Sequence, residues 1–219
     1  KQEEWQAELW DVAEQKSVAV LSHAAAINSV RFSPDGKQAV TGDSDGVVKI
    51  WDALTGILQK KIDSRSGGPW VAGGIQQTAL SPDNQYLAIG QQDGWLLLWP
   101  VQNDKGPVEL SGHLDTVSVL DFSPDGRFLL SGDFAGVYKL WDVAGAREIT
   151  ELCPESRKQG RAFSAREWLP DSRRLIFADE SGRIRKVSTD EGQLVGEWKS
   201  DVWRPLSLFC RPGQPDCLA

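Results

Sequence analysis

Short runs of alternating apolar and polar residues, each ended by a turn signal, recur along the chain. Residues 28–32 (Asn-Ser-Val-Arg-Phe) alternate at the period of a β-strand, and a Pro-Asp-Gly turn at 34–36 then reverses the chain. A second strand ends near the Asp-Gly pair at 45–46, a dipeptide that supplies the positive φ of a tight hairpin. Third and fourth strands follow, the fourth over 57–62. The pattern predicts a four-stranded antiparallel sheet.

The same pattern returns at a fixed spacing. Ser-Pro-Asp-Gly at 33–36 recurs as Ser-Pro-Asp-Asn at 81–84, as Ser-Pro-Asp-Gly at 123–126 and as Leu-Pro-Asp-Ser at 169–172. Each copy is followed by a glycine and then by a tryptophan or valine at constant offsets: Gly46 and Trp51, Gly94 and Trp99, Gly136 and Trp141, Gly182 and Val187. One such sheet cannot bury both of its faces alone. Repeats of about 40 residues therefore indicate sheets that stack as neighbours, as propeller blades do.

Several of these motifs together resemble the WD-repeat signature. The segments that carry the resemblance are Ser111-Gly112-His113, Ser123-Pro124-Asp125-Gly126, Ser131-Gly132 and Trp141-Asp142. The resemblance implies an all-β fold, a β-propeller built from four-stranded antiparallel blades. It covers nearly the whole chain, because the motif elements recur in one order.

The family resemblance also implies a structural tetrad of His, Ser or Thr, Asp and Trp that links the strands of a blade by hydrogen bonds. By position, one unit matches it fully with His23, Thr41, Asp45 and Trp51. The other units match in part: His113, Ser131 and Trp141 with Ala135 in the Asp place; Asp93 and Trp99 with Val71 in the His place; Ser181 and Val187 with no His. We expect the last of these blades to rely on packing.

The chain of 219 residues holds about five repeat units, which we interpret as one propeller domain, 1–219. The predicted units are 1–22 together with 205–219 as one divided blade, 23–62, 63–110, 111–152 and 153–204. One hypothesis is that strands near 206–210 and 216–219 pair with strands near 4–10 and 17–21 and close a five-bladed ring. The alternative is an arc of a larger propeller.

Composition narrows the class of protein. The hydrophobic content of 40 % and the charged content of 25 % are typical of a globular protein, and no apolar run is long enough to span a bilayer. The net charge of −7 argues against nucleic acid as a partner. Three cysteines at no metal-ligand spacing favour a cytoplasmic protein with reduced thiols, the alternative being a mature secreted or periplasmic chain. We expect Cys210 and Cys217 to be buried thiols; a disulfide between them is the other interpretation.

No group of residues indicates catalysis. The aspartates that recur in the turn slot are interpreted as structural: Asp35, Asp83, Asp125 and Asp171. His23 and His113 occupy equivalent places in two units, which favours the structural tetrad over a catalytic or metal site. We therefore expect no catalytic residue, no metal and no cofactor, and a protein that is not an enzyme. A propeller hydrolase or oxidoreductase with a metal in its channel is the weakest alternative.

The resemblance implies a scaffold that binds a protein or peptide, as a domain of a larger signalling or assembly protein. The alternative is a permanent structural subunit that packs against another chain, including a partner chain that completes the propeller. The candidate partner-binding residues are Trp70, in the insertion 63–74, and four arginines of the basic stretch 157–186: Arg161, Arg166, Arg173 and Arg174. The other interpretations are a tryptophan folded back over a blade edge and, for the arginines, a solvated surface with local ion pairs.

Overall fold

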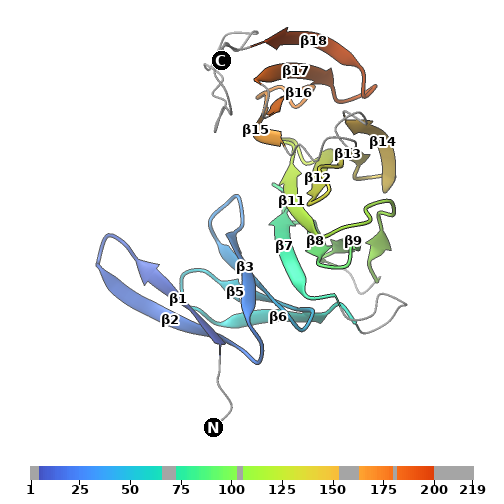
Figure 1. The fold of residues 1–219 in the computed structure, drawn as a ribbon. Coiled ribbons are helices and arrows are strands. Elements are labelled where there is room, and N and C mark those ends of the chain that lie inside the picture. The colour runs from blue at the N-terminus through green and yellow to red at the C-terminus, as the bar shows by residue number, and fades with distance from the viewer. Residues whose placement is uncertain (1–4, 66–72, 103–105, 153–162, 180–181, 200–219) are drawn as a thin grey trace. The chain divides into compact units, whose positions relative to one another are not determined.

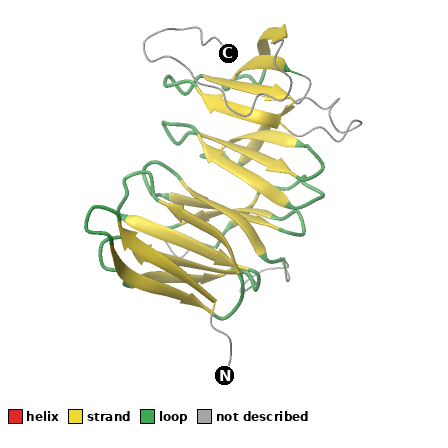
Figure 2. Ribbon diagram, turned by 60° about the vertical axis from the view of Figure 1, so that its left-hand side comes forward, coloured by secondary structure: helices red, strands yellow, loops and turns green. Residues whose placement is uncertain are grey.

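The computed structural model describes residues 5–65, 73–102, 106–152, 163–179 and 182–199 (Figure 1). The chain divides into two compact units, 1–120 and 121–219, and each is described by itself. Every regular element among the described residues is a β-strand (Figure 2). No helix in this part of the chain is long and apolar enough to cross a membrane.

The first unit contains one two-stranded sheet and two four-stranded antiparallel sheets. The two-stranded sheet pairs β1 with β2, and the others have the orders β3-β4-β5-β6 and β10-β9-β8-β7. The strands are β1 Trp5–Asp11, β2 Lys16–His23, β3 Ile27–Phe32, β4 Gln38–Asp43, β5 Val47–Asp52, β6 Leu58–Asp63, β7 Ile75–Leu80, β8 Tyr86–Gln91, β9 Leu96–Pro100 and β10 Val108–Glu109.

The two four-stranded sheets of the first unit bury a shared apolar core. It draws on both sheets through Val40, Val48, Ile50, Ile62, Ile75, Leu80, Leu87, Ile89 and Leu97. The first strands also bond to each other, because the hydroxyls of Ser29 on β3 and Thr78 on β7 lie 2.9 Å apart and both residues are buried. Each sheet thus covers the face that its neighbour would otherwise expose, as the repeat predicts.

The division between the units falls within β11 (Val117–Phe122), the first strand of a sheet with the order β11-β12-β13-β14. The remaining strands of that sheet are β12 Phe128–Asp133, β13 Tyr138–Asp142 and β14 Arg147–Leu152. The last sheet has the order β15-β16-β17-β18, with β15 Phe163–Trp168, β16 Arg174–Asp179, β17 Arg183–Ser188 and β18 Leu194–Lys199.

The recurring Ser-Pro-Asp motif forms the same turn after the first strand of three sheets. In the turn at 33–36 the Ser33 hydroxyl donates to Asp35 at 2.7 Å and accepts from the Gln38 amide at 2.9 Å. The turns of Ser81 with Asp83 and of Ser123 with Asp125 repeat both bonds. These aspartates therefore hold the turn by satisfying groups inside it.

The all-β class and the four-stranded antiparallel sheets predicted from the sequence are confirmed. The proposed closing strands at 206–210 and 216–219, with Cys210 and Cys217, lie outside the described residues. Pairing of these strands with β1 and β2 stays a prediction.

Candidate functional site

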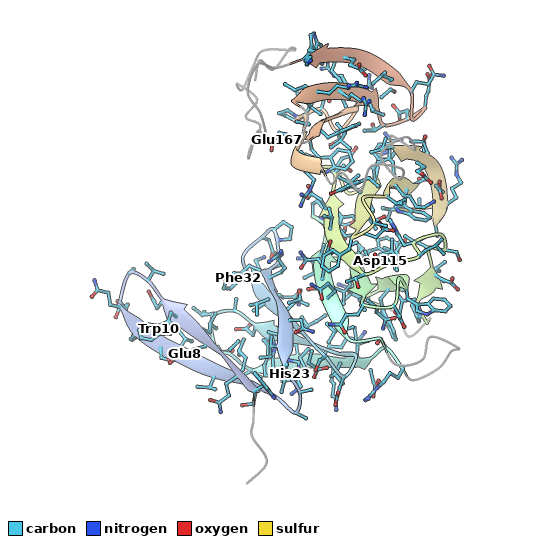
Figure 3. The ribbon with its side chains drawn as sticks, in the orientation of Figure 1. Glu8, Trp10, His23, Phe32, Asp115 and Glu167 are labelled. Atoms are coloured by element: carbon cyan, nitrogen blue, oxygen red, sulfur yellow. The ribbon has the colours of Figure 1, made fainter. Side chains whose placement is uncertain are left out.

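A buried hydrogen-bond chain links three strands of the first unit. His23 ends β2, Thr41 lies on β4 and Trp51 on β5. The Trp51 indole Nε1 donates to Thr41 Oγ1 at 2.8 Å, and Thr41 Oγ1 lies 2.6 Å from His23 Nε2. The other ring nitrogen, His23 Nδ1, is 2.7 Å from Asp43 Oδ2. Figure 3 labels His23 and shows it among the strands of this unit.

Burial decides the protonation state of His23. His23 is 2 % exposed, and desolvation lowers its pKa against the opposing effect of Asp43. A neutral imidazole donates through one nitrogen and accepts through the other. His23 therefore donates from Nδ1 to the Asp43 carboxylate and accepts the Thr41 hydroxyl proton at Nε2. Both imidazole nitrogens are thus bonded between the sheets β1–β2 and β3–β6, which leaves neither nitrogen free for a metal or a substrate.

The structure corrects the acidic member of this set from Asp45 to Asp43. Asp45 is exposed on the β4–β5 turn, two residues beyond the residue that contacts His23. Asp43 ends β4, where its Oδ1 also accepts from the Val47 amide at 2.8 Å. The carboxylate must lie at the end of the strand to reach the imidazole and the hairpin amide together. The sequence signal that would have found it is the Gly-Asp pair at 42–43, which recurs at 132–133.

The sheet β7–β10 replaces the histidine and aspartate with a neutral pair. His23 and Ser64 occupy equivalent positions. Trp10 pairs with Ser17 and Trp51 pairs with Leu58 across neighbouring strands. His23 lies six residues after Ser17, and Ser64 lies six residues after Leu58. The Ser64 hydroxyl accepts from Gln91 Nε2 at 2.8 Å, and both residues are fully buried. The assignment of the histidine place to Val71 is therefore wrong, and Val71 itself lies outside the described residues.

Asp93 is also not a tetrad member. It is exposed on the β8–β9 turn, while Gln91 takes the strand-end position that corresponds to Asp43. Ile89 occupies the place of Thr41 and is fully buried, so this position carries no hydroxyl to accept from the indole of this sheet. Trp99 packs against the shared core of the first unit.

The sheet containing β12 and β13 keeps the tryptophan and its hydroxyl partner. Trp141 Nε1 donates to Ser131 Oγ at 2.7 Å, and both residues are buried. Asp133 ends β12, and its Oδ1 accepts from the Val137 amide at 2.9 Å, as Asp43 does from Val47. Asp133 therefore corresponds to Asp43, and the reading of Ala135 as a lost aspartate is wrong. His113, in the first unit, is 6 % exposed.

The last sheet has an apolar side chain in the place of Thr41. Phe177 holds this position on β16 and is 1 % exposed, and Val187 takes the tryptophan place at 3 % exposed. Ile176, Ala178 and Ile184 complete the buried side chains at its centre together with Leu169. Ser181 lies outside the described residues. The apolar replacements agree with the expectation that this blade relies on packing.

Of the candidate partner-binding residues, Trp70 and Arg161 lie outside the described residues, and the other three lie in the second unit. Arg173 is exposed, and Arg174 Nη2 is 2.7 Å from Asp171 Oδ2. Burial disfavours the charge on Asp171, but hydrogen bonds from Arg174 and the Arg173 amide outweigh it and lower the pKa of this carboxyl. Arg166 faces Asp121, with 3.9 Å between Nε and Oδ2.

Burial raises the pKa of the Asp121 carboxyl, and the charge of Arg166 only partly opposes this. Two further arginines of the stretch, Arg183 and Arg185, share the carboxylate of Glu197. Apart from Arg173, the described arginines of the basic stretch thus face acidic neighbours. This pairing favours the local ion-pair interpretation over one continuous basic patch.

A cavity of about 240 Å³ lies at one end of the sheet β7–β10. Its walls are the β8–β9 turn and the segment that follows β10: Asp93, Gly94, Trp95, Leu96, Glu109, Leu110, Ser111, Gly112 and His113. Sequence reasoning singled out Asp93 and His113 for another role and missed this cavity, because neither a turn nor a strand end predicts a gap between them. No group of three or more His, Cys, Asp or Glu side chains within the described segments could hold a metal ion.

Comparisons with known proteins agree with this architecture. The model of the family "WD domain, G-beta repeat" matches residues 15–52 and 107–142. The small ribosomal subunit protein RACK1 of Caenorhabditis elegans is 28 % identical over 176 residues, which is 76 % of this chain and 52 % of that protein. Protein groucho of Drosophila melanogaster is 28 % identical over 125 residues, 57 % of this chain and 17 % of that protein.

A second RACK1 relative, RACK1y of Oryza sativa subsp. japonica, is 28 % identical over 180 residues, 79 % of this chain and 51 % of that protein. The chain therefore spans about half the length of the two RACK1 proteins. Among solved structures, a chain in the crystal structure of the mitotic checkpoint complex has a TM-score of 0.74 and 20 % identity. The match covers 96 % of this chain and 62 % of that one, and at this identity it shows the fold.

The matched segments contain the His23, Thr41 and Trp51 chain and the Ser131 and Trp141 pair. The repeat motifs, the sheets that they form and the relatives agree on one assignment. Residues 15–52 and 107–142 match the WD-repeat model, and the relatives and the fold support the WD-repeat family, with the four-stranded sheets as blades of a β-propeller.

Proposed function

We propose that this protein is a non-catalytic scaffold that binds a protein or peptide. The observation that carries the proposal is the contrast between its interior and its turns. The polar groups most suited to chemistry, His23 with Asp43 and Thr41, are buried and bonded to one another. The turns instead present large apolar side chains to solvent. Recognition residues are commonly carried on such loops above a rigid frame.

Two exposed apolar side chains are the first candidates for contact residues. Leu114, between β10 and β11, is 89 % exposed, and Phe134, in the β12–β13 turn, is 63 % exposed. Single exposed apolar residues are common, but an aromatic side chain on a tight turn is the type of group that becomes a binding hot spot. The names of the relatives fit this role, since one is a protein of the small ribosomal subunit and the structural neighbour belongs to a multi-protein complex.

The test is affinity capture from an extract of the cells that express the protein, followed by titration calorimetry with each purified captured protein. We expect Phe134→Glu or Leu114→Glu to weaken one such interaction by at least about 10-fold. Val12→Glu is the matched control, because Val12 is 85 % exposed in the β1–β2 turn. Equal affinity for wild type and all three variants, or no captured protein that binds directly, would contradict the proposal.

A permanent structural subunit is the second candidate. It is favoured by the sheet β1–β2, which has two strands among the described residues where the other sheets have four, and by Trp5 and Trp10 on β1, which are 49 % and 53 % exposed. Figure 3 labels Trp10 on this hairpin. Sedimentation velocity separates the two candidates, since a permanent subunit co-purifies with its partner at fixed stoichiometry. The cytoplasmic location stays a proposal that rests on the cysteine pattern.

A further inference from the structure

The cavity beside β10 exists because this outer strand is short. Among the described residues, β10 pairs with β9 through Val108 and Glu109, and the Leu110 amide adds one more bond to the Leu96 carbonyl at 2.8 Å. The corresponding strand of the preceding sheet, β6, runs for six residues. There the chain continues to the hairpin turn, where the amide and hydroxyl of Ser64 both donate to the Gly46 carbonyl.

After Leu110 the chain leaves the sheet instead. Gly112, with φ of 127°, turns it away from β9, and the space between this segment and the β8–β9 turn stays open. The opening of about 240 Å³ is smaller than the roughly 300–1,000 Å³ of sites for drug-sized ligands. Its size therefore suits one inserted side chain.

The walls of the cavity are acidic and aromatic. Asp93 is exposed, while Glu109 and Trp95 are half-buried, and none of the nine lining residues that the structure describes is a lysine or arginine. The Glu109 carboxylate accepts from the Ser111 hydroxyl at 2.6 Å. In the part of the chain that the structure describes, neither Asp93 nor Glu109 has a cationic side chain within salt-bridge distance. A third acidic residue, Asp115, follows the lining segment (Figure 3).

The same set of groups holds a lysine elsewhere in this protein. Lys139 is 5 % exposed, and its ammonium lies 5.8 Å from the centroid of the Trp141 ring. It also contacts the carboxylates of Glu148 at 2.5 Å and Glu151 at 3.8 Å. One indole and two carboxylates thus compensate for the desolvation of a buried ammonium. The cavity is lined by one indole, Trp95, and two carboxylates, and its described lining residues include no lysine or arginine.

We propose that this cavity receives a lysine side chain of the bound protein or peptide. The inference rests on the proposed scaffold function and names the chemistry that one of its surfaces recognises. The Trp95 indole packs against the methylene stem and ammonium, and Asp93 and Glu109 neutralise the charge. The protein's net charge of −7 adds a long-range attraction for a basic partner.

The test needs only the purified protein and a small probe. N-acetyl-lysine methylamide is titrated into ¹⁵N-labelled protein, and N-acetyl-norleucine methylamide serves as the probe without the ammonium. We expect the lysine probe to shift the amide signals of Gly94, Ser111 and Gly112 with a Kd on the order of 10 mM at low salt. Raising the salt to about 0.1 M should weaken binding, because exposed carboxylates are screened.

Variants identify the groups responsible. Glu109→Gln and Trp95→Leu should each weaken binding of the lysine probe by about 5-fold or more. Asp45→Asn is the matched control, because Asp45 is an exposed carboxylate on the equivalent turn of the preceding sheet, and it should leave the Kd unchanged. The amide spectrum of each variant shows whether the sheet is intact, and Asp93→Asn provides an independent variant on the opposite wall if Glu109→Gln disturbs it.

Equal shifts with the norleucine probe, or no shift of the cavity signals with the lysine probe, would overturn the proposal. So would an unchanged Kd in both Glu109→Gln and Asp93→Asn. This result is independent of the capture experiment for the scaffold function. The cavity proposal can fail while a partner is still bound through other turns, and the probe can bind even if no partner is captured.

Discussion

Replacing Thr41 with valine tests whether the buried hydrogen-bond chain stabilises the first unit. The Thr41 hydroxyl joins His23 Nε2 to Trp51 Nε1, and the residue is fully buried. Valine keeps the branched shape and places a methyl group where the hydroxyl was. The substitution therefore removes two hydrogen bonds with little change in volume.

The magnitude follows from what the substitution leaves behind. His23 Nε2 and the Trp51 indole N–H would both stay buried without a partner, since His23 is 2 % and Trp51 is 7 % exposed. Each unsatisfied buried group costs about 1–3 kcal/mol, so we expect Thr41→Val to lower the free energy of unfolding by about 3 kcal/mol. Because the imidazole can partly rearrange, we expect a loss of unfolding free energy near the lower end of the sum of the two costs.

The assay is urea denaturation followed by circular dichroism, with Thr55→Val as the control. Thr55 is exposed, and its hydroxyl donates to Asp52 at 2.8 Å in the β5–β6 turn. Its loss should change the free energy of unfolding by no more than about 0.5 kcal/mol. A loss below about 1 kcal/mol for Thr41→Val, or one equal to that of Thr55→Val, would refute the stabilising role of the chain.

Two further predictions concern pH and close packing. Because burial lowers the pKa of His23, the unfolded state binds a proton that the folded state does not, so stability is fully present above the ordinary histidine pKa of 6.5 and declines as the pH falls below it. The denaturation midpoint should be lower near pH 5.5 than near pH 7.5, and the difference should shrink in His23→Gln; an equal difference in the variant would refute this assignment. Gly90→Ala would place a Cβ 2.8 Å from the Val117 carbonyl oxygen and should cost about 2 kcal/mol of unfolding free energy. Gly106→Ala, which meets no atom within 4 Å, should cost far less, and equal losses in the two variants would show that the close approach is not the cause.

The repeat determined most of the fold. Strand period, turn dipeptides and the spacing of the tryptophans are local properties, because each sheet forms from consecutive strands joined by short turns. That is why the local pattern predicts the Ser-Pro-Asp turns, while the pair of Thr41 with Trp51 within one repeat is what the resemblance to WD repeats implies.

Only the tertiary structure decided which acidic group meets the histidine and where a cavity opens. Asp43 and Asp45 are two residues apart and chemically identical, and the choice depends on how far β4 extends before the chain turns. Ser64 takes the position that His23 holds in the preceding repeat, where the order of the motifs predicts Val71. The pairing of β5 with β6 brings Ser64 within hydrogen-bond distance of Gln91. The cavity likewise depends on β10 ending after two residues. The sequence by itself thus determined the repeating sheet, whose pattern is local, while the register and lengths of its strands in space determined which side chains meet.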